Sequence, residues 1–220
     1  MNFICATIEL KDFVGDPINA YGLDYCGANA AVPANSSASE VRFRVLCYSR
    51  SGPKLQAFLD WKPGTRALIT GNLVFNDDPS QPLDLIVTTL ETNIPQEMYC
   101  NQVILGNAFF GKPETIKERD NGTIACKIGT TLDNSEVTTW LWMETHASRK
   151  EKFYDRHRSG RHCCIQGYIR EWRTEGDDGC YRAIVSHDFS TRKDQDKSRR
   201  NPQTGGSASG YSEVDPTPVY

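Results

Sequence analysis

Apolar and polar residues alternate in short runs along most of the chain, which is the period of a half-buried β-strand. In the run VRFRVLCY, for example, Val41, Phe43 and Val45 fall on one face while Arg42 and Arg44 fall on the other. Strands are expected at residues 2–10, 41–48, 65–75 and 83–92 in the first half, and at 99–108, 123–131, 137–145, 162–173 and 180–188 in the second. The pattern therefore predicts an all-β protein.

Two segments depart from this alternation. Apolar residues at helical spacing predict a short helix within residues 52–60, and residues 147–159 predict a second helix that is basic. The stretch 15–39 is long, small in its side chains and polar, and it predicts an extended loop or a distorted hairpin.

The order strand, strand, helix, glycine-containing strand, strand occurs twice along the chain. TRALITGNL at residues 65–73 and RHCCIQGYI at residues 161–169 each place an apolar pair and a polar residue before a glycine, Gly71 or Gly167. Gly71 predicts a bulge or a bend in its strand. We interpret the chain as a diverged tandem duplication of one small β-barrel.

Five short strands with a helix between the third and the fourth is the order of the oligonucleotide-binding (OB) fold. Only four strands are clear in the first half, so either residues 12–32 hide a fifth or the copy is incomplete. The predicted fold is two tandem OB-fold barrels, each a five-stranded Greek key, with short helices and a disordered C-terminal tail. The predicted domains are a diverged OB-fold at residues 1–95, a second OB-fold at 97–190 and the tail at 191–220.

Composition changes this picture only slightly. The 220 residues carry a net charge of −3, so no global basic field indicates nucleic acid. Residues 1–95 hold 7 Lys and Arg against 10 Asp and Glu, whereas residues 147–182 concentrate nine basic residues. No early segment resembles a signal peptide and no run reaches the roughly 18 apolar residues of a membrane helix. A soluble, cytoplasmic protein without membrane contact is therefore expected.

Eight cysteines raise the question of a disulfide framework or a metal site. None forms a CxxC pair and most lie inside apolar strand-like runs, so buried reduced thiols are favoured over zinc. The densest local group includes Cys163 and Cys164, whose side chains point to opposite faces of a strand. No Gly-rich phosphate loop, nucleophile elbow or HExxH motif is present, and the acidic residues are scattered in loops. We therefore expect neither an enzyme nor a bound metal or cofactor.

The candidate chemistry lies between residues 137 and 181. Trp140 and Trp142 share one face of their strand, because side chains alternate with period two. The basic helix follows, and the next strand carries Tyr168, Arg170 and Trp172. Aromatic side chains interleaved with Arg and Lys are what a surface needs in order to stack bases and neutralise phosphates.

Several motifs in this half occur together in one known family. They are NQVILGN at 101–107, GKPE at 111–114, the pair Thr139-Trp140, GYIREW at 167–172, and Gly179 with Tyr181-Arg182. With these motifs the second half resembles the bacterial single-stranded-DNA-binding protein family. The first half resembles a more distant copy of it, through KPGT at 62–65 and GNL at 71–73.

The resemblance implies a role for each matching aromatic position. Trp140 and Trp172 would be stacking platforms, and His146 would occupy a third aromatic position. Trp142 stands where the family commonly has a basic residue, and it is equally compatible with packing at a protein interface. The first half has only Trp61, beside its helix, so a packing or dimerisation module or a weaker binder is expected there. The family's four-barrel assembly implies a homodimer of this two-barrel chain.

We therefore predict sequence-independent binding and protection of single-stranded DNA during replication, recombination and repair. Stacking on tryptophan and phosphate neutralisation by basic side chains would give strong salt dependence. The predicted DNA-binding residues are Trp140, Trp142, His146, Arg149, Lys150, Lys152, Arg156, Arg170, Trp172, Arg173 and Arg182. Arg156, beside Asp155, is equally compatible with a solvated helix face. The alternative function is an OB-fold protein-interaction scaffold that does not bind nucleic acid.

The tail has a different composition from the rest of the chain. Its charged and then small polar residues cannot bury enough apolar surface to offset the entropy of ordering, which predicts disorder. The last residues, EVDPTPVY, resemble the acidic, aromatic-ended tip with which the family recruits replication and repair proteins. The predicted partner-binding residues are Glu213, Asp215, Pro218 and Tyr220. An ordinary disordered terminus is equally compatible with this segment. A cytoplasmic, nucleoid-associated location follows from the same resemblance.

Overall fold

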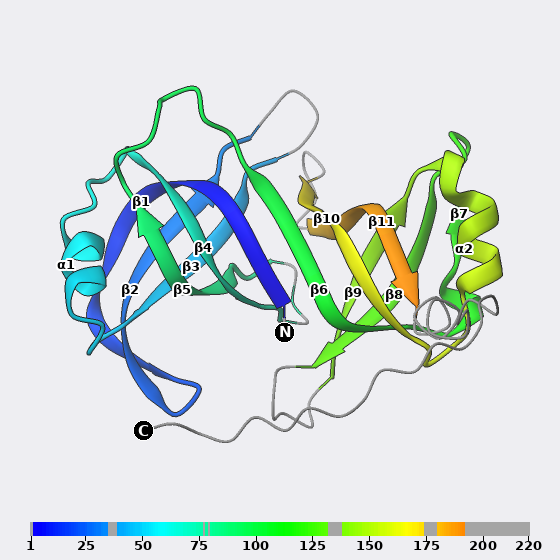
Figure 1. Cartoon of the computed structure of the whole chain (residues 1–220), viewed down its shortest axis with the longest axis horizontal. Helices are drawn as coiled ribbons and strands as arrows, with labels where there is room; N and C mark the ends of the chain where they lie inside the picture. Colours follow the sequence, from blue (N-terminus) through cyan, green and yellow to red (C-terminus); the bar gives the residue numbers. More distant parts are fainter. Residues whose placement is uncertain are drawn as a thin grey trace, which may run out of the picture.

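The computed structural model describes residues 2–34, 39–76, 78, 80–131, 138–173 and 180–191. These residues form two β-barrels that lie side by side and share one continuous sheet of eleven strands (Figure 1). The helices α1 (Pro53–Leu59) and α2 (Lys150–Arg156) lie at the two outer ends of the molecule, far from the line where the barrels meet.

The first barrel, barrel 1, is a closed ring of five strands. Its strands are β1 (Asn2–Ala20), β2 (Leu23–Val32), β3 (Val41–Tyr48), β4 (Arg66–Val74) and β5 (Leu83–Glu91). The ring runs β1-β2-β3-β5-β4 and returns to β1, and only the β3–β5 pair is parallel. Helix α1 stands between β3 and β4 and buries Phe58 in the core.

The second barrel, barrel 2, repeats this order. Its ring consists of β6 (Asn101–Phe110), β8 (Ile124–Thr131), β9 (Thr138–Thr145), β10 (His162–Arg173) and β11 (Cys180–Thr191). The ring runs β6-β8-β9-β11-β10 and returns to β6, and its β9–β11 pair is parallel. Three short elements complete the barrel: η1 (Pro113–Thr115), β7 (Lys117–Glu118) and η2 (Ala147–Arg149). Two five-stranded OB-type rings confirm the predicted fold class.

The stretch 15–39, expected to be an extended loop or a distorted hairpin, is largely a long β1–β2 hairpin, and β2 is the missing fifth strand of barrel 1. Two register shifts bend this hairpin, and Ile18 lies across Gly27, where an added Cβ would meet its Cδ1 at 2.3 Å. The turn at Tyr21 and Gly22 has positive φ at both residues. The outer part of the hairpin is exposed on both faces, so it carries no alternating pattern from which a strand could be predicted.

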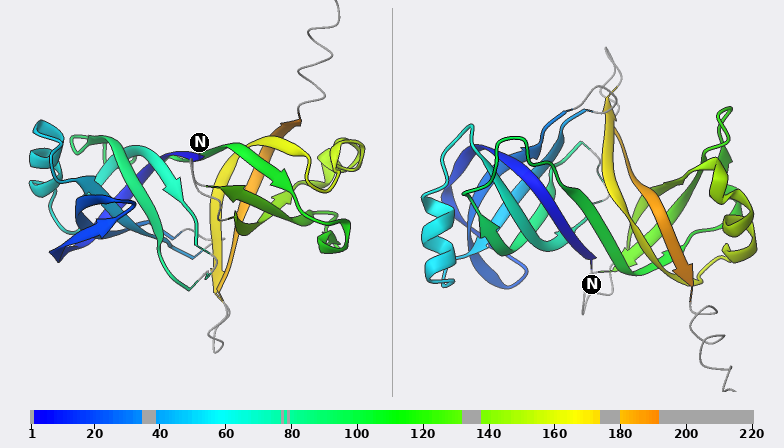
Figure 2. Two further views of the ribbon diagram at one scale, coloured as in Figure 1. Left: turned by 90° about the horizontal axis from the view of Figure 1, so that it is seen from below. Right: turned by 45° about the horizontal axis from the view of Figure 1, so that its top comes forward.

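The barrels meet along β1 and β6, which pair antiparallel from Asn2 opposite Leu105 to Ala6 opposite Asn101. Both views in Figure 2 show the two rings joined at this line. The side-chain amide of Asn2 donates a hydrogen bond from Nδ2 to Thr130 Oγ1 at 2.8 Å, which links the start of barrel 1 to β8. Because backbone ladder bonds cross the junction, the two barrels form one continuous framework.

A buried ion pair lies at the same junction. Arg182 donates from Nε at 2.7 Å and from Nη2 at 2.6 Å to Glu171 Oε1, and both side chains are almost completely buried. The Arg182 guanidinium also donates to the carbonyl of Gln81 in barrel 1 at 2.8 Å. The Glu171 carbonyl accepts from the Ser39 amide at 3.0 Å. These bonds attach the far end of the β10–β11 hairpin to barrel 1.

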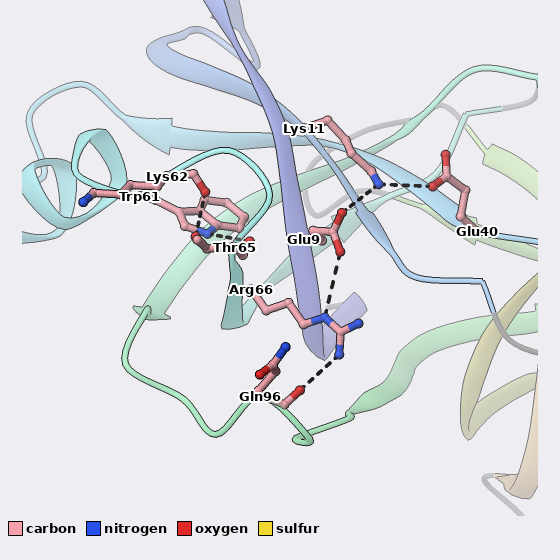
Figure 3. A network of polar contacts seen from close by, with 8 residues as sticks. All are labelled: Glu9, Lys11, Glu40, Trp61, Lys62, Thr65, Arg66 and Gln96. Atoms are coloured by element: carbon pink, nitrogen blue, oxygen red, sulfur yellow. Dashed lines mark hydrogen bonds and ion pairs between the residues drawn. The ribbon is translucent and has the colours of Figure 1, made fainter.

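The connection between the barrels, residues 92–100, is held against barrel 1 by a small polar network (Figure 3). Arg66 donates to the Gln96 carbonyl at 3.2 Å and lies 3.9 Å from Glu9, which also binds Lys11 at 3.0 Å. Lys11 reaches Glu40 at 3.5 Å. Exposed ion pairs of this kind contribute little each, so the network mainly fixes the course of the connection.

Trp61 belongs to the core of barrel 1. Its side chain is 1% exposed, and its indole N–H donates to the Thr65 carbonyl at 3.2 Å, as Figure 3 shows. Phe43 and Phe75 are buried in the same core. These three aromatic side chains therefore stabilise barrel 1 by packing in its core, and they are not exposed to solvent.

The two glycines that marked the internal repeat occupy equivalent positions. Gly71 in β4 and Gly167 in β10 each lie at a register shift in the hairpin with the following strand. An added Cβ would meet the Ile86 carbonyl oxygen at 2.3 Å in the first case and the Val185 carbonyl oxygen at 2.1 Å in the second. The bulge predicted at Gly71 is confirmed, and both bulges need a residue without a side chain because a backbone strand lies against them.

Replacing Gly167 by alanine is expected to lower the free energy of unfolding by about 1–3 kcal/mol, because the new methyl group has to displace a backbone carbonyl. Gly71→Ala is expected to do the same in barrel 1. Urea denaturation followed by far-UV circular dichroism measures both. Gly15→Ala is the matched control, since an added Cβ there meets nothing within 4 Å. An unchanged urea midpoint for Gly167→Ala would contradict this account of the bulge.

Candidate functional site

Strand β9 presents tryptophans on its outer face. Leu141 and Met143 point into the core of barrel 2 and are buried, whereas Trp140 is 43% exposed and Trp142 is half-buried. The alternation in the sequence therefore places both tryptophans on one outward face, as predicted.

Three aromatic rings form a row across the outer face of barrel 2. The ring centroids of Trp142 and Tyr181 lie 6.0 Å apart, and those of Tyr181 and Trp172 lie 5.2 Å apart. Trp172 and Tyr181 are directly opposite in the β10–β11 ladder, and β11 brings Tyr181 next to β9. We call Trp142, Tyr181 and Trp172 the aromatic row.

Cationic side chains lie over the rings of this row. The ammonium groups of Lys117 and Lys127 lie 4.9 and 4.8 Å from the centre of the Trp142 ring. The Arg170 guanidinium lies 4.4 Å from the Trp172 ring, and that of Arg119 lies 5.4 Å from the Tyr181 ring. Positive charge over aromatic faces is favourable in itself, and it also brings cations within reach of any polyanion that stacks on the rings.

One end of the aromatic row opens into a groove of about 350 Å³. The groove is lined on one side by Arg170 and Trp172 of β10 and on another by His146 and Arg119. Three residues singled out from the sequence are thus brought together: Arg170 and Trp172 from β10, and His146 from the start of η2. His146 accepts a hydrogen bond from the Ser148 amide at 3.2 Å through Nδ1, which fixes its ring at the start of η2.

The buried carboxylate of Glu144 binds two side chains of the site, Arg119 and Tyr181. It is 4% exposed, forms an ion pair with Arg119, and accepts a hydrogen bond from the Tyr181 hydroxyl at 3.2 Å. Burial, with the Glu144 charge as a second cause, raises the pKa of Tyr181 above its ordinary value. The hydroxyl therefore stays protonated as a donor at neutral pH, and Arg119 is held over the aromatic row by a fixed carboxylate.

Trp140 belongs to a separate aromatic contact on the same face. Its ring meets the edge of Phe109 with centroids 5.5 Å apart, and Phe109 is 6.0 Å from His162. Gly129 lies between Phe109 and Trp140 in the strand register, and an added Cβ there would meet the Phe109 ring at 2.4 Å. Gly129 therefore makes room for Phe109 to lie beside Trp140.

The basic residues of the second helix lie outside the groove. Arg149 and Lys152 both contact Asp188, at 3.3 and 2.6 Å, and Lys150 contacts Glu118 at 2.5 Å. Arg156 contacts Asp155 at 2.8 Å. The first three of these pairs are well exposed to solvent, and such pairs are weak enough for a phosphate to replace the carboxylate. Their predicted contacts with DNA stay predictions.

The remaining predicted residues fall into two groups. Arg182 is 7% exposed and bound to Glu171, so its guanidinium lies inside the barrel junction and not on the outer face. Arg173 ends β10, but its side chain lies outside the described part of the structure, as do the tail residues Glu213, Asp215, Pro218 and Tyr220.

Three site residues were missed from the sequence: Lys117, Arg119 and Lys127. They come from the short β7–β8 hairpin, whose turn contains Asn121 and Gly122, the latter with φ of 76°. An Asn-Gly pair flanked on both sides by alternating polar and apolar residues is a strong signal for a β-hairpin. Basic residues two apart, on one face of that hairpin, could therefore have been assigned to the site from sequence.

Comparison with known proteins finds a likeness of fold but not of sequence. No family model matches the chain, and no curated protein matches it. The wild-type single-stranded-DNA-binding protein from Thermus aquaticus superposes with a TM-score of 0.54 over 96% of this chain and 97% of its own, at 16% identity. The chain has the fold of that protein. A deletion mutant of the Thermus protein gives the same TM-score at 17% identity, covering 87% of this chain and 94% of its own. The resemblance to single-stranded-DNA-binding proteins seen in the sequence is thus confirmed at the level of the fold.

Barrel 1 has no comparable aromatic row among its described residues. The outward positions of β3 carry Arg42 and Arg44, and Asp84 binds the Arg44 guanidinium at 2.6 and 2.7 Å through both carboxylate oxygens. The Tyr21 hydroxyl donates to Asp84 at 2.6 Å. Burial, assisted by Asp84, raises the pKa of Tyr21. On this part of the outer face of barrel 1 the Arg44 charge is therefore neutralised by Asp84, and Tyr21 at the hairpin tip binds the same carboxylate.

Other chemistry is sparse in the part of the chain that is described. Seven cysteines carry free thiols, and burial raises the pKa of the Cys163 thiol to about 12. No group of three or more His, Cys, Asp or Glu side chains among the described residues is placed to hold a metal ion. Within the same residues, every helix is too short or too polar to cross a bilayer.

Proposed function

We propose that this protein binds single-stranded DNA without sequence preference, through the outer face of barrel 2. The observation that carries the proposal is the aromatic row of Trp142, Tyr181 and Trp172, which is flanked by four cations and opens into a groove. Base faces stack on such rings whatever the base, and Lys and Arg neutralise the phosphates between them. The fold shared with the Thermus single-stranded-DNA-binding protein supports the same function.

Binding through this surface is a non-covalent process. Stacking on each ring contributes about 1–3 kcal/mol per base, and each phosphate that meets a cation releases condensed counterions. We propose this role for Lys117, Lys127, Arg119 and Arg170, which lie over the rings of the row, and the exposed basic residues of α2 would extend it. The proposed protein is a binding protein that protects single strands during replication, recombination and repair, and not an enzyme.

The proposed assembly is a homodimer that brings four barrels together, with barrel 1 serving mainly for packing. The excess of acidic residues in positions 1–95 and the neutralisation of Arg44 by Asp84 on the outer face of barrel 1 support this division. The last residues of the tail, from Glu213 to Tyr220, are proposed to recruit replication and repair proteins.

Tryptophan fluorescence tests the function directly. Titration with oligo-dT at low salt is expected to quench the emission strongly and to saturate at a fixed stoichiometry, because bases stack on Trp142 and Trp172 of the aromatic row and on Trp140, which is exposed on the same outer face. Binding is expected to weaken steeply as salt rises, with a slope set by the number of phosphates contacted.

A protein-interaction scaffold is the second candidate, because exposed aromatic side chains also suit a protein partner. It predicts no quenching by oligo-dT at low salt and no dependence on salt of the kind that counterion release produces. Absence of quenching at low salt would overturn the proposed function and assign the aromatic row to a protein interface.

A further inference from the structure

A second cavity lies between the two barrels, with a volume of about 410 Å³. One wall is the outer face of β10 with His187 of β11, another is the connection at Tyr99 and Cys100, and the third comes from the ends of β2 and β3. We call this cavity the inter-barrel cleft. Its volume is within the range of sites that bind small ligands, and a nucleotide unit is of that kind.

The inter-barrel cleft continues the groove beside the aromatic row. Tyr168 and Arg170 line both cavities, because they occupy successive outward positions on β10. Tyr181 and Trp142 of the row lie on the β9 side of β10, and the cleft lies on its β6 side. A nucleic-acid strand that crosses Trp172 in the direction of barrel 1 therefore enters the cleft next.

The chemistry of the cleft suits a nucleotide. The Tyr168 and His187 rings lie 5.2 Å apart, and Tyr99 is 54% exposed at the entrance. Arg170 supplies a positive charge, and no Asp or Glu is among the described residues that line the cleft. Ring faces for stacking, together with a cation and no carboxylate to repel a phosphate, are the features of a single-strand binding surface.

Hydrogen bonds hold two walls of the cleft in place. The Asn101 side chain donates to the Ile169 carbonyl at 2.9 Å and accepts from the Ile169 amide at 3.3 Å, so β6 is fixed to β10 at the cleft floor. The Thr7 amide donates to the Cys100 carbonyl at 2.8 Å, which holds the connection to barrel 1. A preformed cavity needs little ordering of its walls on binding, which favours affinity.

We infer that the inter-barrel cleft is an additional base-binding subsite, in which a base of the same DNA strand stacks on Tyr99 while Arg170 contacts the phosphate between cleft and groove. The inference rests on the proposed function, and it assigns to the barrel junction a binding role beyond holding the two barrels together. It also gives barrel 1, through the ends of β2 and β3, a wall of the binding path, although barrel 1 has no aromatic row of its own among the described residues.

Tyr99→Ala is the test, since Tyr99 is exposed and its ring can be removed without opening the core. Affinity for an oligo-dT of about 16 nucleotides, the upper end of the site size for one such barrel, is expected to fall about fivefold or more. Tyr99→Phe keeps the ring and is expected to bind like the wild type. The tryptophan quenching at saturation is expected to stay unchanged in both variants, because the groove is still occupied.

Two further measurements make the result decisive. Photo-crosslinking of wild-type protein with an oligonucleotide that carries 5-iodouracil, followed by mass spectrometry, is expected to place a crosslink on the peptide containing Tyr99. Tyr154→Ala is the control, because it removes a tyrosine of similar exposure, 43%, that lies on α2 and outside the cleft. Its affinity for the same oligo-dT is expected to stay within twofold of the wild type.

The possible failures are distinguishable. If wild-type protein shows no quenching with oligo-dT, the proposed function itself fails. If quenching is normal but Tyr99→Ala binds as tightly as wild type and no crosslink reaches its peptide, the cleft is not part of the binding path and this inference is overturned.

Discussion

The Arg182→Met variant is expected to be less stable than the wild type by about 3–5 kcal/mol, the largest loss of stability among the substitutions considered. The cause is Glu171, whose side chain is 0% exposed and would lose the guanidinium that neutralises it. The Gln81 carbonyl would lose its donor from Arg182 as well, so the barrel junction weakens together with the β10–β11 hairpin. Urea denaturation monitored by circular dichroism measures the effect.

The double variant Glu171→Met/Arg182→Met is the control. Replacing both partners of a buried pair by apolar residues of similar size is often neutral, because the cost of desolvating two charges disappears with their attraction. Its stability is therefore expected to lie within about 1 kcal/mol of the wild type. Equal losses in the single and double variants would show that the site depends on packing shape and not on an uncompensated charge.

The same double variant separates stability from DNA binding. Arg182 is a predicted phosphate contact by sequence, yet its guanidinium faces the barrel junction. If the junction is its only role, the salt dependence of oligo-dT binding is expected to be the same in the double variant and in the wild type. If the slope of log affinity against log salt concentration falls by about 1 in the double variant, Arg182 contacts a phosphate.

Much of the fold follows from local pattern. The alternation along β9 determines that Leu141 and Met143 enter the core and that Trp142 faces outward, because one face of each barrel strand has to be buried. The repeated glycines Gly71 and Gly167 could be matched because each bulge admits no side chain. Such features are encoded by neighbours in the sequence or by the adjacent strand.

What could not be predicted depends on contacts between distant segments. Arg182 has the same local setting as a surface arginine, and its interior position depends on Glu171 across the hairpin and on the Gln81 carbonyl from barrel 1. The inter-barrel cleft likewise depends on the β1–β6 ladder, which brings the ends of β2 and β3 in barrel 1 next to β10. Hydrophobic periodicity and composition describe one element at a time. They therefore carry no information on contacts between segments that are distant in the sequence.

The site shows the same division between local and distant effects. Trp172 and Arg170 could be assigned from one strand, because two residues apart they share its outward face. Arg119 lies more than fifty positions earlier and reaches the aromatic row only because Glu144 binds it there. The tryptophans were therefore accessible to sequence reasoning, whereas the full set of cations around them was not.

The double variant Trp140→Ala/Trp172→Ala is expected to lose most of its affinity for single-stranded DNA. Two stacking platforms of about 1–3 kcal/mol each give a loss of about 2–6 kcal/mol if they act independently. This variant lacks two of the four tryptophans, so its intrinsic fluorescence no longer reports binding as in the wild type. The affinity is therefore measured by the anisotropy of a labelled oligo-dT. Its folding is checked by circular dichroism, since Trp172 packs against Tyr181 and Arg170.

The matched control is Trp140→Phe/Trp172→Phe, which keeps an aromatic face at both positions and is expected to retain most of the affinity. The two single alanine variants separate the sites. Trp172 adjoins the groove and the cations of the aromatic row, whereas Trp140 belongs to a separate ring pair with Phe109. If Trp172→Ala binds as tightly as the wild type while Trp140→Ala does not, the path of the strand runs along Phe109 and Trp140, and the groove is not its principal site.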